Sequence, residues 1–171
     1  SYWLVTQVEF SDSLLAFDVG AAGISIAPQV SILSESTTNV SGYLKANVAG
    51  NVLASCHEMG LVQLMQFDNS IGVVTNDLIF PSVNSSYGAE FSPNSQFLYT
   101  APRSSVGTLY QYAIGSFDSA QIVASQDTIA TGIGTGALQL GPDQRIYMAR
   151  SFGLSNGFLS CIQEPNNLGV N

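Results

Sequence analysis

The chain has 171 residues, of which 46% are hydrophobic and 9% are charged. This composition excludes a disordered chain and is enough for one domain with a substantial core. Acidic residues number 12 against 4 Lys and Arg, and the resulting net charge of −8 disfavours nucleic acid and anionic membranes as partners.

Short strands separated by turns account for most of the chain. Ser, Thr, Asn, Gln and Gly take the place of charged residues, which is typical of strands and tight turns rather than of exposed helices. Runs of β-forming residues predict strands at 2–8, 14–19, 29–33, 43–46, 52–56, 61–68, 78–80, 88–91, 97–101, 108–113, 121–125, 136–140, 146–149 and 158–162. A glycine turn at 20–23 and a polar loop at 34–41 lie between the first of these.

Three segments repeat one pattern, an apolar strand followed by a turn and a second apolar strand. LGPDQRIY at 140–147 matches FSPNSQFL at 91–98 and, more loosely, ANVAGNVL at 46–53, so the copies stand 45 and 49 residues apart. The copies open at Gly42, Gly88 and Gly136. Proline presets the backbone of a β-turn, and the Asn or Asp after it accepts main-chain hydrogen bonds. The first copy has Val-Ala-Gly at 48–50 instead, which leaves its turn type open.

A period of 40 to 50 residues with about four short strands predicts an all-β fold, the β-propeller, with one four-stranded blade per period. The blades are placed approximately at 1–41, 42–87, 88–135 and 136–171, which makes about three and a half to four blades. We expect an arc of a larger ring. Because open blades favour association, the missing blades should come from further residues of a parent protein or, second, from another copy of the chain.

Two stretches resemble a known family. GALQLGPDQRIYMA, followed by LSCIQEPNNLG, and YGAEFSPNSQFLYTA, followed by LYQYAI, look like the WD40-like propeller domain of large secreted surface proteins of Bacteroidota. Such proteins often end in gliding-motility-associated or type IX secretion sorting domains. The resemblance implies a ring of about six to eight blades, export across both membranes and an extracellular place at the cell surface. It implies no catalytic residues, because the shared positions build turns and strands.

Two cysteines and one histidine raise the question of catalysis or metal binding. Cys56 and His57 form a possible nucleophile and base, but adjacent strand residues point to opposite faces, so no catalytic residue is predicted. The cysteines stand 105 residues apart and lack zinc-ligand spacing; no metal and no cofactor are predicted. Cys56 and Cys161 fall in blades that are not neighbours, beyond disulfide reach, which favours two buried free thiols.

Three further motifs have a structural and a functional interpretation. GIGTG at 132–136 has the glycines of a dinucleotide loop but opens a strand rather than a helix, which favours an ordinary loop. DNSIG at 68–72 has too few oxygen ligands for a calcium loop, which favours a hairpin turn. The triplets DSL, DSA and DTI fit the O-glycosylation pattern of the surface proteins that the chain resembles, and make Ser13, Ser119 and Thr128 possible sites; ordinary turns are the alternative.

These observations lead us to expect a non-enzymatic extracellular propeller, a scaffold for adhesion or for assembly with protein partners at the cell surface. A carbohydrate-binding, lectin-like module is an alternative, in which exposed aromatics such as Trp3, Tyr87 or Phe152 would stack on sugars; as core residues they need no such role. A polysaccharide hydrolase or lyase is less favoured. It needs clustered carboxylates or a His, and the Asp and Glu residues are scattered singly along the chain.

Overall fold

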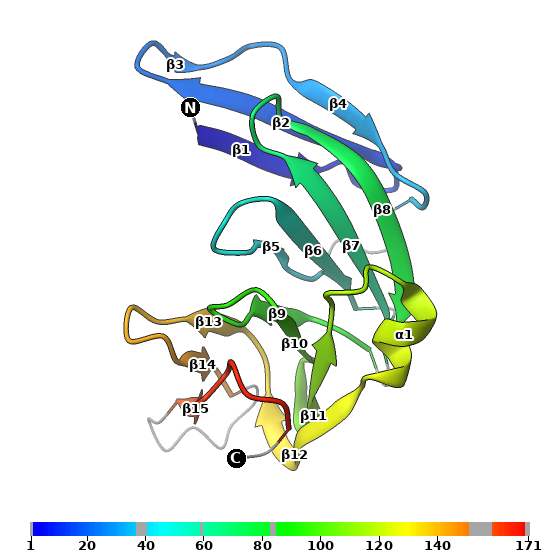
Figure 1. Cartoon of the computed structure of the whole chain (residues 1–171), viewed down its shortest axis with the longest axis vertical. Coiled ribbons are helices and arrows are strands. Elements are labelled where there is room, and N and C mark those ends of the chain that lie inside the picture. The colour runs from blue at the N-terminus through cyan, green and yellow to red at the C-terminus, as the bar shows by residue number, and fades with distance from the viewer. Residues whose placement is uncertain (1, 37–40, 59, 83–84, 151–158, 170–171) are drawn as a thin grey trace.

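The computed structural model describes residues 2–36, 41–58, 60–82, 85–150 and 159–169. They form four antiparallel sheets, named A to D in chain order, which lie side by side along an arc (Figure 1). The predicted all-β fold is confirmed, and the sheets are arranged as the four blades of a β-propeller. Among the described residues no helix is long and apolar enough to cross a membrane.

Each sheet is built from strands that follow one another in the sequence. Sheet A contains β1 (Tyr2–Gln7), β2 (Ser13–Gly20), β3 (Gly23–Ile24) and β4 (Gln29–Ile32); β2 pairs with all three others. Sheet B runs in the order β5 (Leu44–Ala46), β6 (Val52–His57), β7 (Leu61–Asp68) and β8 (Val73–Pro81). Sheet C has β9 (Gly88–Phe91), β10 (Phe97–Ala101), β11 (Ser104–Ala113) and β12 (Asp127–Thr135), and sheet D has β13 (Leu138–Leu140), β14 (Ile146–Met148) and β15 (Ser160–Ile162).

The first strands of sheets B, C and D are equivalent, as the repeat predicts. β5, β9 and β13 each form one edge of their sheet, on the concave side of the arc (Figure 1). Here the sheets approach one another closely. A side-chain carbon on Gly88 would lie 2.1 Å from the carbonyl oxygen of Gly136, so this position requires glycine.

The three repeated turns share one backbone form. In each, the fourth residue donates its N–H to the carbonyl of the first, for the pairs Gly50 to Asn47, Ser95 to Ser92 and Gln144 to Gly141. The fourth residue has a positive φ of 68°, 60° and 67° respectively. The turn at 48–50, left open by the sequence, is therefore the same turn as the two proline turns. Glycine adopts its left-handed conformation without steric cost.

Three apolar clusters hold the sheets together. The cluster between sheets B and C is centred on fully buried side chains such as Leu64, Phe80 and Tyr112. The one between sheets C and D contains Tyr99, Ile146 and Met148. The third, between sheets A and B, is described with the site below.

The outer faces of the two terminal sheets differ in polarity. Sheet A exposes apolar side chains from three of its strands: Tyr2, Leu4, Ile24, Val30 and Ile32. On sheet D the outward positions are Gln139, Tyr147 and Cys161, which stand opposite one another in register. The face of sheet A thus has the composition of an interface, whereas the face of sheet D does not.

The strand predicted at 121–125 is wrong, because these residues belong mostly to the helix α1 (Ser119–Ala124). Asp118 caps this helix: its carboxylate accepts the N–H of Gln121 at 2.8 Å. The fourth strand of sheet C is β12, which contains most of the GIGTG run. β8 begins five residues before the predicted 78–80, and residue 158 of the last predicted strand lies outside the described residues.

Candidate functional site

The interface between sheets A and B has an apolar half and a polar half. The apolar half consists of buried side chains from β2, β6 and β7 and from the residue that follows β4: Leu14, Ala16, Leu33, Leu53, Met65 and Phe67. The polar half follows from the alternation of side chains along β6. Ser55 and His57 point towards sheet A, as Leu53 does, whereas Ala54 and Cys56 point towards sheet C.

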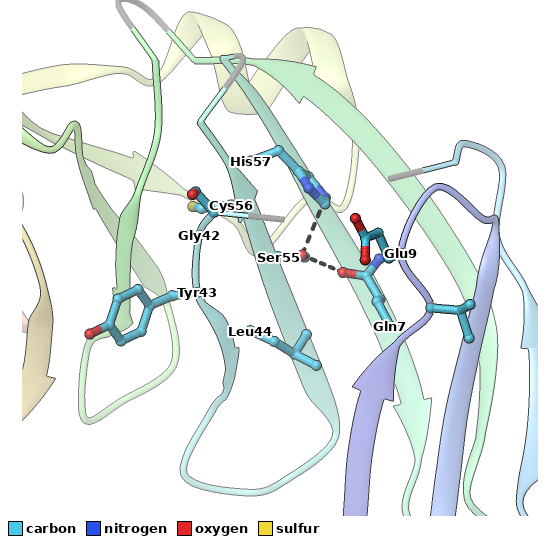
Figure 2. Close-up of a pocket in the computed structure, with 10 residues that line it drawn as sticks. Gln7, Glu9, Gly42, Tyr43, Leu44, Ser55, Cys56 and His57 are labelled. Carbon is cyan, nitrogen blue, oxygen red and sulfur yellow. Dashed lines mark hydrogen bonds between the residues drawn. The ribbon is translucent and has the colours of Figure 1, made fainter. Parts of the chain in front are cut away.

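A chain of side-chain hydrogen bonds runs through the polar half; we call it the polar relay. The imidazole Nε2 of His57 lies 3.3 Å from Oγ of Ser55, and this hydroxyl donates to Oε1 of Gln7 at 2.5 Å (Figure 2). Nε2 of Gln7 donates to Oε1 of Gln63 at 3.0 Å. Nε2 of Gln63 in turn donates to Oδ2 of Asp77 at 2.9 Å. The polar relay therefore joins β1 of sheet A to three strands of sheet B.

A pocket of about 220 Å³ opens beside the polar relay. Its lining comes from the end of β1, the approach to β5 and the end of β6. Figure 2 shows the imidazole of His57 and the carboxylate of Glu9 on the same side of the pocket. Imidazole and carboxylate are the side chains that general acid–base catalysis uses most. The described lining contains no Lys or Arg.

Cys56 takes no part in this arrangement, although it precedes His57 in the sequence. Its side chain belongs to the apolar cluster between sheets B and C and is 2% exposed. Burial raises the pKa of its thiol to about 12, against a smaller lowering by a hydrogen bond with Ser86. A thiol with this pKa is neutral at physiological pH and is a poor nucleophile. The hydroxyl beside His57 belongs to Ser55.

The two cysteines are both free, as predicted. The prediction that both are buried is wrong for Cys161, which is exposed. It is the central residue of the short strand β15 and points away from sheet C, so no other sheet of the described structure covers it.

The other candidate segments are engaged in structural contacts. The DNSIG segment is the turn between β7 and β8, in which the carboxylate of Asp68 accepts from both the hydroxyl and the N–H of Ser70. These hydrogen bonds, the hydroxyl's first, lower the pKa of Asp68. Among the described residues no group of three or more His, Cys, Asp or Glu is placed to hold a metal ion.

The aromatic residues considered for sugar stacking are packed inside the arc. Trp3 meets Phe67 edge to face and donates its indole N–H to the carbonyl of Asn69 at 2.8 Å. Tyr87 meets Tyr43 edge to face, with their ring centroids 5.3 Å apart. Phe152 lies outside the described residues.

The possible O-glycosylation sites differ in accessibility. The hydroxyl of Ser119 donates to the carbonyl of Ile79 at 2.9 Å, and Ser13 is half-buried and bonded to Ser11. Thr128 is exposed on β12. O-glycosylation stays a prediction, with Thr128 as the most accessible of the three hydroxyls.

A second polar cluster lies on the concave side, where equivalent positions of β5, β9 and β13 meet. Nζ of Lys45 donates to Oε2 of Glu90 at 3.1 Å and to Oε1 of Gln139 at 2.8 Å. The same oxygen of Glu90 accepts the N–H of Leu140. The charges of this cluster compensate one another, so we assign it to the packing of three blades.

Sequence reasoning missed the polar relay. A Ser and a His two positions apart on a strand share a face, so Ser55 and His57 carried a local signal. Gln7 and Asp77 carried none, because they come from another blade and another strand.

No known family model matches this sequence. No curated protein matches it.

Its fold, however, matches solved structures. A candidate 6-phosphogluconolactonase from Bacteroides uniformis has a TM-score of 0.59 and 13% identity, over 94% of this chain and 50% of that one. A second one, from Bacteroides fragilis, has a TM-score of 0.54 and 14% identity, over 95% and 54%. The holo form of the PQQ domain of a pyranose dehydrogenase from Coprinopsis cinerea has a TM-score of 0.61 and 10% identity, over 94% and 45%.

The chain therefore spans about half the length of these solved structures. Identities this low show a shared fold alone. The prediction that the chain is not an enzyme is nevertheless contradicted, because two of these structural neighbours are candidate 6-phosphogluconolactonases. The scattered carboxylates on which that prediction rested do not exclude a site, since Glu9 and His57 line one pocket.

Proposed function

We propose that this chain carries the pocket of a propeller hydrolase that opens a small uncharged lactone or ester, with His57 as the general base. One observation carries the proposal: the single histidine of the chain and the carboxylate of Glu9 line the same pocket, beside a buried polar relay. The shared fold of two candidate lactonases supports the reaction class.

The chemistry requires one proton acceptor that later returns its proton. The imidazole of His57 takes a proton from a water molecule while the oxygen of that water attacks the carbonyl carbon of the lactone. The ring C–O bond of the resulting tetrahedral intermediate then breaks, and the leaving alkoxide takes the proton from the imidazolium. The product is the open hydroxy acid. The negative charge of the Glu9 carboxylate stabilises the positively charged imidazolium between the two proton transfers.

Size and charge define the substrate class. A volume of about 220 Å³ lies below the roughly 300–1,000 Å³ of pockets for drug-sized ligands, so a single small ring fits best. The described lining offers no Lys or Arg to a phosphate, and Glu9 repels an anion. A net charge of −8 adds to this repulsion. We therefore favour an uncharged lactone over a phosphorylated one.

The test measures acid release from five- and six-membered lactones, with and without a phosphate group, by pH-stat titration. We expect turnover of the uncharged lactones, a loss of about 100-fold or more in kcat in His57→Gln, and a smaller loss in Glu9→Gln. Glu164→Gln is the matched control, because it removes an exposed carboxylate that follows β15 of sheet D. Hydrolysis at the uncatalysed rate for every lactone, or full activity in His57→Gln, would refute the proposal.

A second candidate function rests on the exposed apolar face of sheet A. We infer that a further blade of the same propeller packs on this face as sheet B packs on the other face. The neighbours' greater length supports this inference. Adhesion or assembly at the cell surface, the role expected from the sequence, would instead need a protein partner on this face. Leu4→Lys should increase the solubility of the isolated chain without unfolding it; loss of folding in this variant would show that the face already packs within the arc.

A further inference from the structure

We propose that Asp77 determines which ring nitrogen of His57 carries the proton, acting as a positioning residue through the polar relay. The effect of Asp77 on catalysis rests on the proposed function, in which His57 is the general base. The fixed tautomer of His57 rests on the hydrogen bonds alone.

The direction of the relay is set at its Asp77 end. An ionised carboxylate accepts hydrogen bonds and donates none. Oδ2 of Asp77 accepts from Nε2 of Gln63 at 2.9 Å, and from the N–H and the hydroxyl of Ser34 at 3.0 and 2.6 Å. Gln63 must therefore turn its NH₂ group towards Asp77, which leaves its carbonyl oxygen to face Gln7.

The same donor-to-acceptor direction applies to Gln7 and Ser55, the next residues of the polar relay. The oxygen of Gln63 accepts from the NH₂ group of Gln7, so the oxygen of Gln7 faces Ser55. The hydroxyl of Ser55 has a single hydrogen, which it donates to that oxygen at 2.5 Å. Towards His57, 3.3 Å away, Ser55 can then only accept. Nε2 of His57 is therefore the nitrogen that carries hydrogen.

Burial makes this direction hard to reverse. Ser55 and Gln63 are each 3% exposed, and His57 is 8% exposed. With the opposite tautomer, Nε2 and Oγ of Ser55, 3.3 Å apart, would meet as two acceptors with no hydrogen between them. Reversing both amides would instead turn the oxygen of Gln63 towards the carboxylate of Asp77. Either arrangement leaves a buried acceptor without a donor.

The fixed tautomer assigns roles to two neighbouring atoms. With hydrogen on Nε2, the lone pair lies on Nδ1, which becomes the basic nitrogen of His57. Ser55 is not a nucleophile activated by His57, because that mechanism requires its hydrogen to point at Nε2. Gln7, Gln63 and Asp77 then act on the reaction only through the orientation of His57.

The experiment uses the single histidine of the chain, which gives one imidazole signal set without assignment. Long-range ¹H–¹⁵N correlation spectra of uniformly ¹⁵N-labelled protein, recorded at a pH where the ring is neutral, give the ratio of the two tautomers. We expect an excess of the Nε2–H form of about 10-fold or more in the wild type. In Asp77→Ala the ratio should fall towards that of N-acetylhistidine amide in the same buffer. Asp77→Asn keeps an acceptor oxygen and should retain most of the excess.

Gln63→Met is the second variant, since it interrupts the relay with a side chain of similar length and leaves Asp77 and Ser34 in place. Fluorescence of Trp3 verifies that each variant is folded. A wild type with mainly Nδ1–H, or an unchanged ratio in Asp77→Ala and Gln63→Met, would overturn the inference. Because the spectra need no substrate, a fixed tautomer without lactone hydrolysis would refute the proposed function alone.

Discussion

Replacing Gly72 by alanine should detach Trp3 from sheet B, and the change can be measured against a matched variant. Gly72 lies in the turn between β7 and β8, with a φ of +77°. A β-carbon at this position would lie 2.5 Å from two carbons of the Trp3 ring, Cη2 and Cζ3. Real β-carbons do not come this close, so the indole has to move.

The expected loss has two parts. A left-handed conformation costs a residue with a β-carbon about 1–2 kcal/mol. Moving the indole also breaks its hydrogen bond to Asn69 and its edge-to-face contact with Phe67, each of which contributes about 0.5–1.5 kcal/mol. Gly72→Ala should therefore lower the free energy of unfolding by about 2–5 kcal/mol.

Gly132→Ala is the control, because Gly132 has a φ of +70° and nothing within 4 Å of its added carbon. This variant should lose only the backbone part, about 1–2 kcal/mol. Urea unfolding followed by circular dichroism measures both losses. Trp3 is the only tryptophan of the chain, so a red-shifted emission in Gly72→Ala alone reports its exposure. Equal losses in the two variants, or unchanged emission in Gly72→Ala, would refute the steric argument.

Three further predictions concern the two thiols and the ion pair between Lys45 and Glu90. In the native protein a thiol reagent should modify Cys161 quickly and Cys56 only after unfolding; two fast thiols would contradict the packing of β6. The pKa of Cys56 is raised from 9.0 to about 12, so its contribution to stability is complete below pH 9.0 and should be lost as the pH rises towards 12. Urea titrations should therefore show the free energy of unfolding falling over this pH range in the wild type, and Cys56→Ala should remove this fall. Lys45→Met leaves Glu90, whose side chain is 5% exposed, without its cation and should cost about 3–5 kcal/mol. Adding Glu90→Gln should recover much of this loss, and a double variant as unstable as Lys45→Met would show that the ion pair is not the cause.

The periodic part of the fold was predictable from the sequence because each repeat contains its own strands and turn. Pro93 and Pro142 identify two turns directly, and Gly50 fills the position in the third that needs a left-handed backbone. The helix at Ser119–Ala124 was missed for a local reason. Its β-forming residues Ile122 and Val123 favour a strand, but the cap from Asp118 begins a helical turn that buries Ile122.

The candidate site was not predictable in the same way. Its pocket and polar relay are formed by contacts between strands from different repeats, such as Gln7 with Ser55. A single sequence carries no signal for a hydrogen bond between side chains 48 positions apart. The alternation on β6 correctly separates Cys56 from His57, but it does not reveal what the facing strand brings to His57.

All strand pairs of the described structure join segments that are close in the sequence. His57 stands opposite Leu61 across a tight hairpin, and even the longest-range pair of sheet C joins Ser104 to Thr135. Closing such short loops costs little chain entropy. Each blade can therefore form soon after its residues leave the ribosome, before the next blade is synthesised. Gain or loss of whole repeats then alters the number of blades without rebuilding the hairpins of the remaining ones.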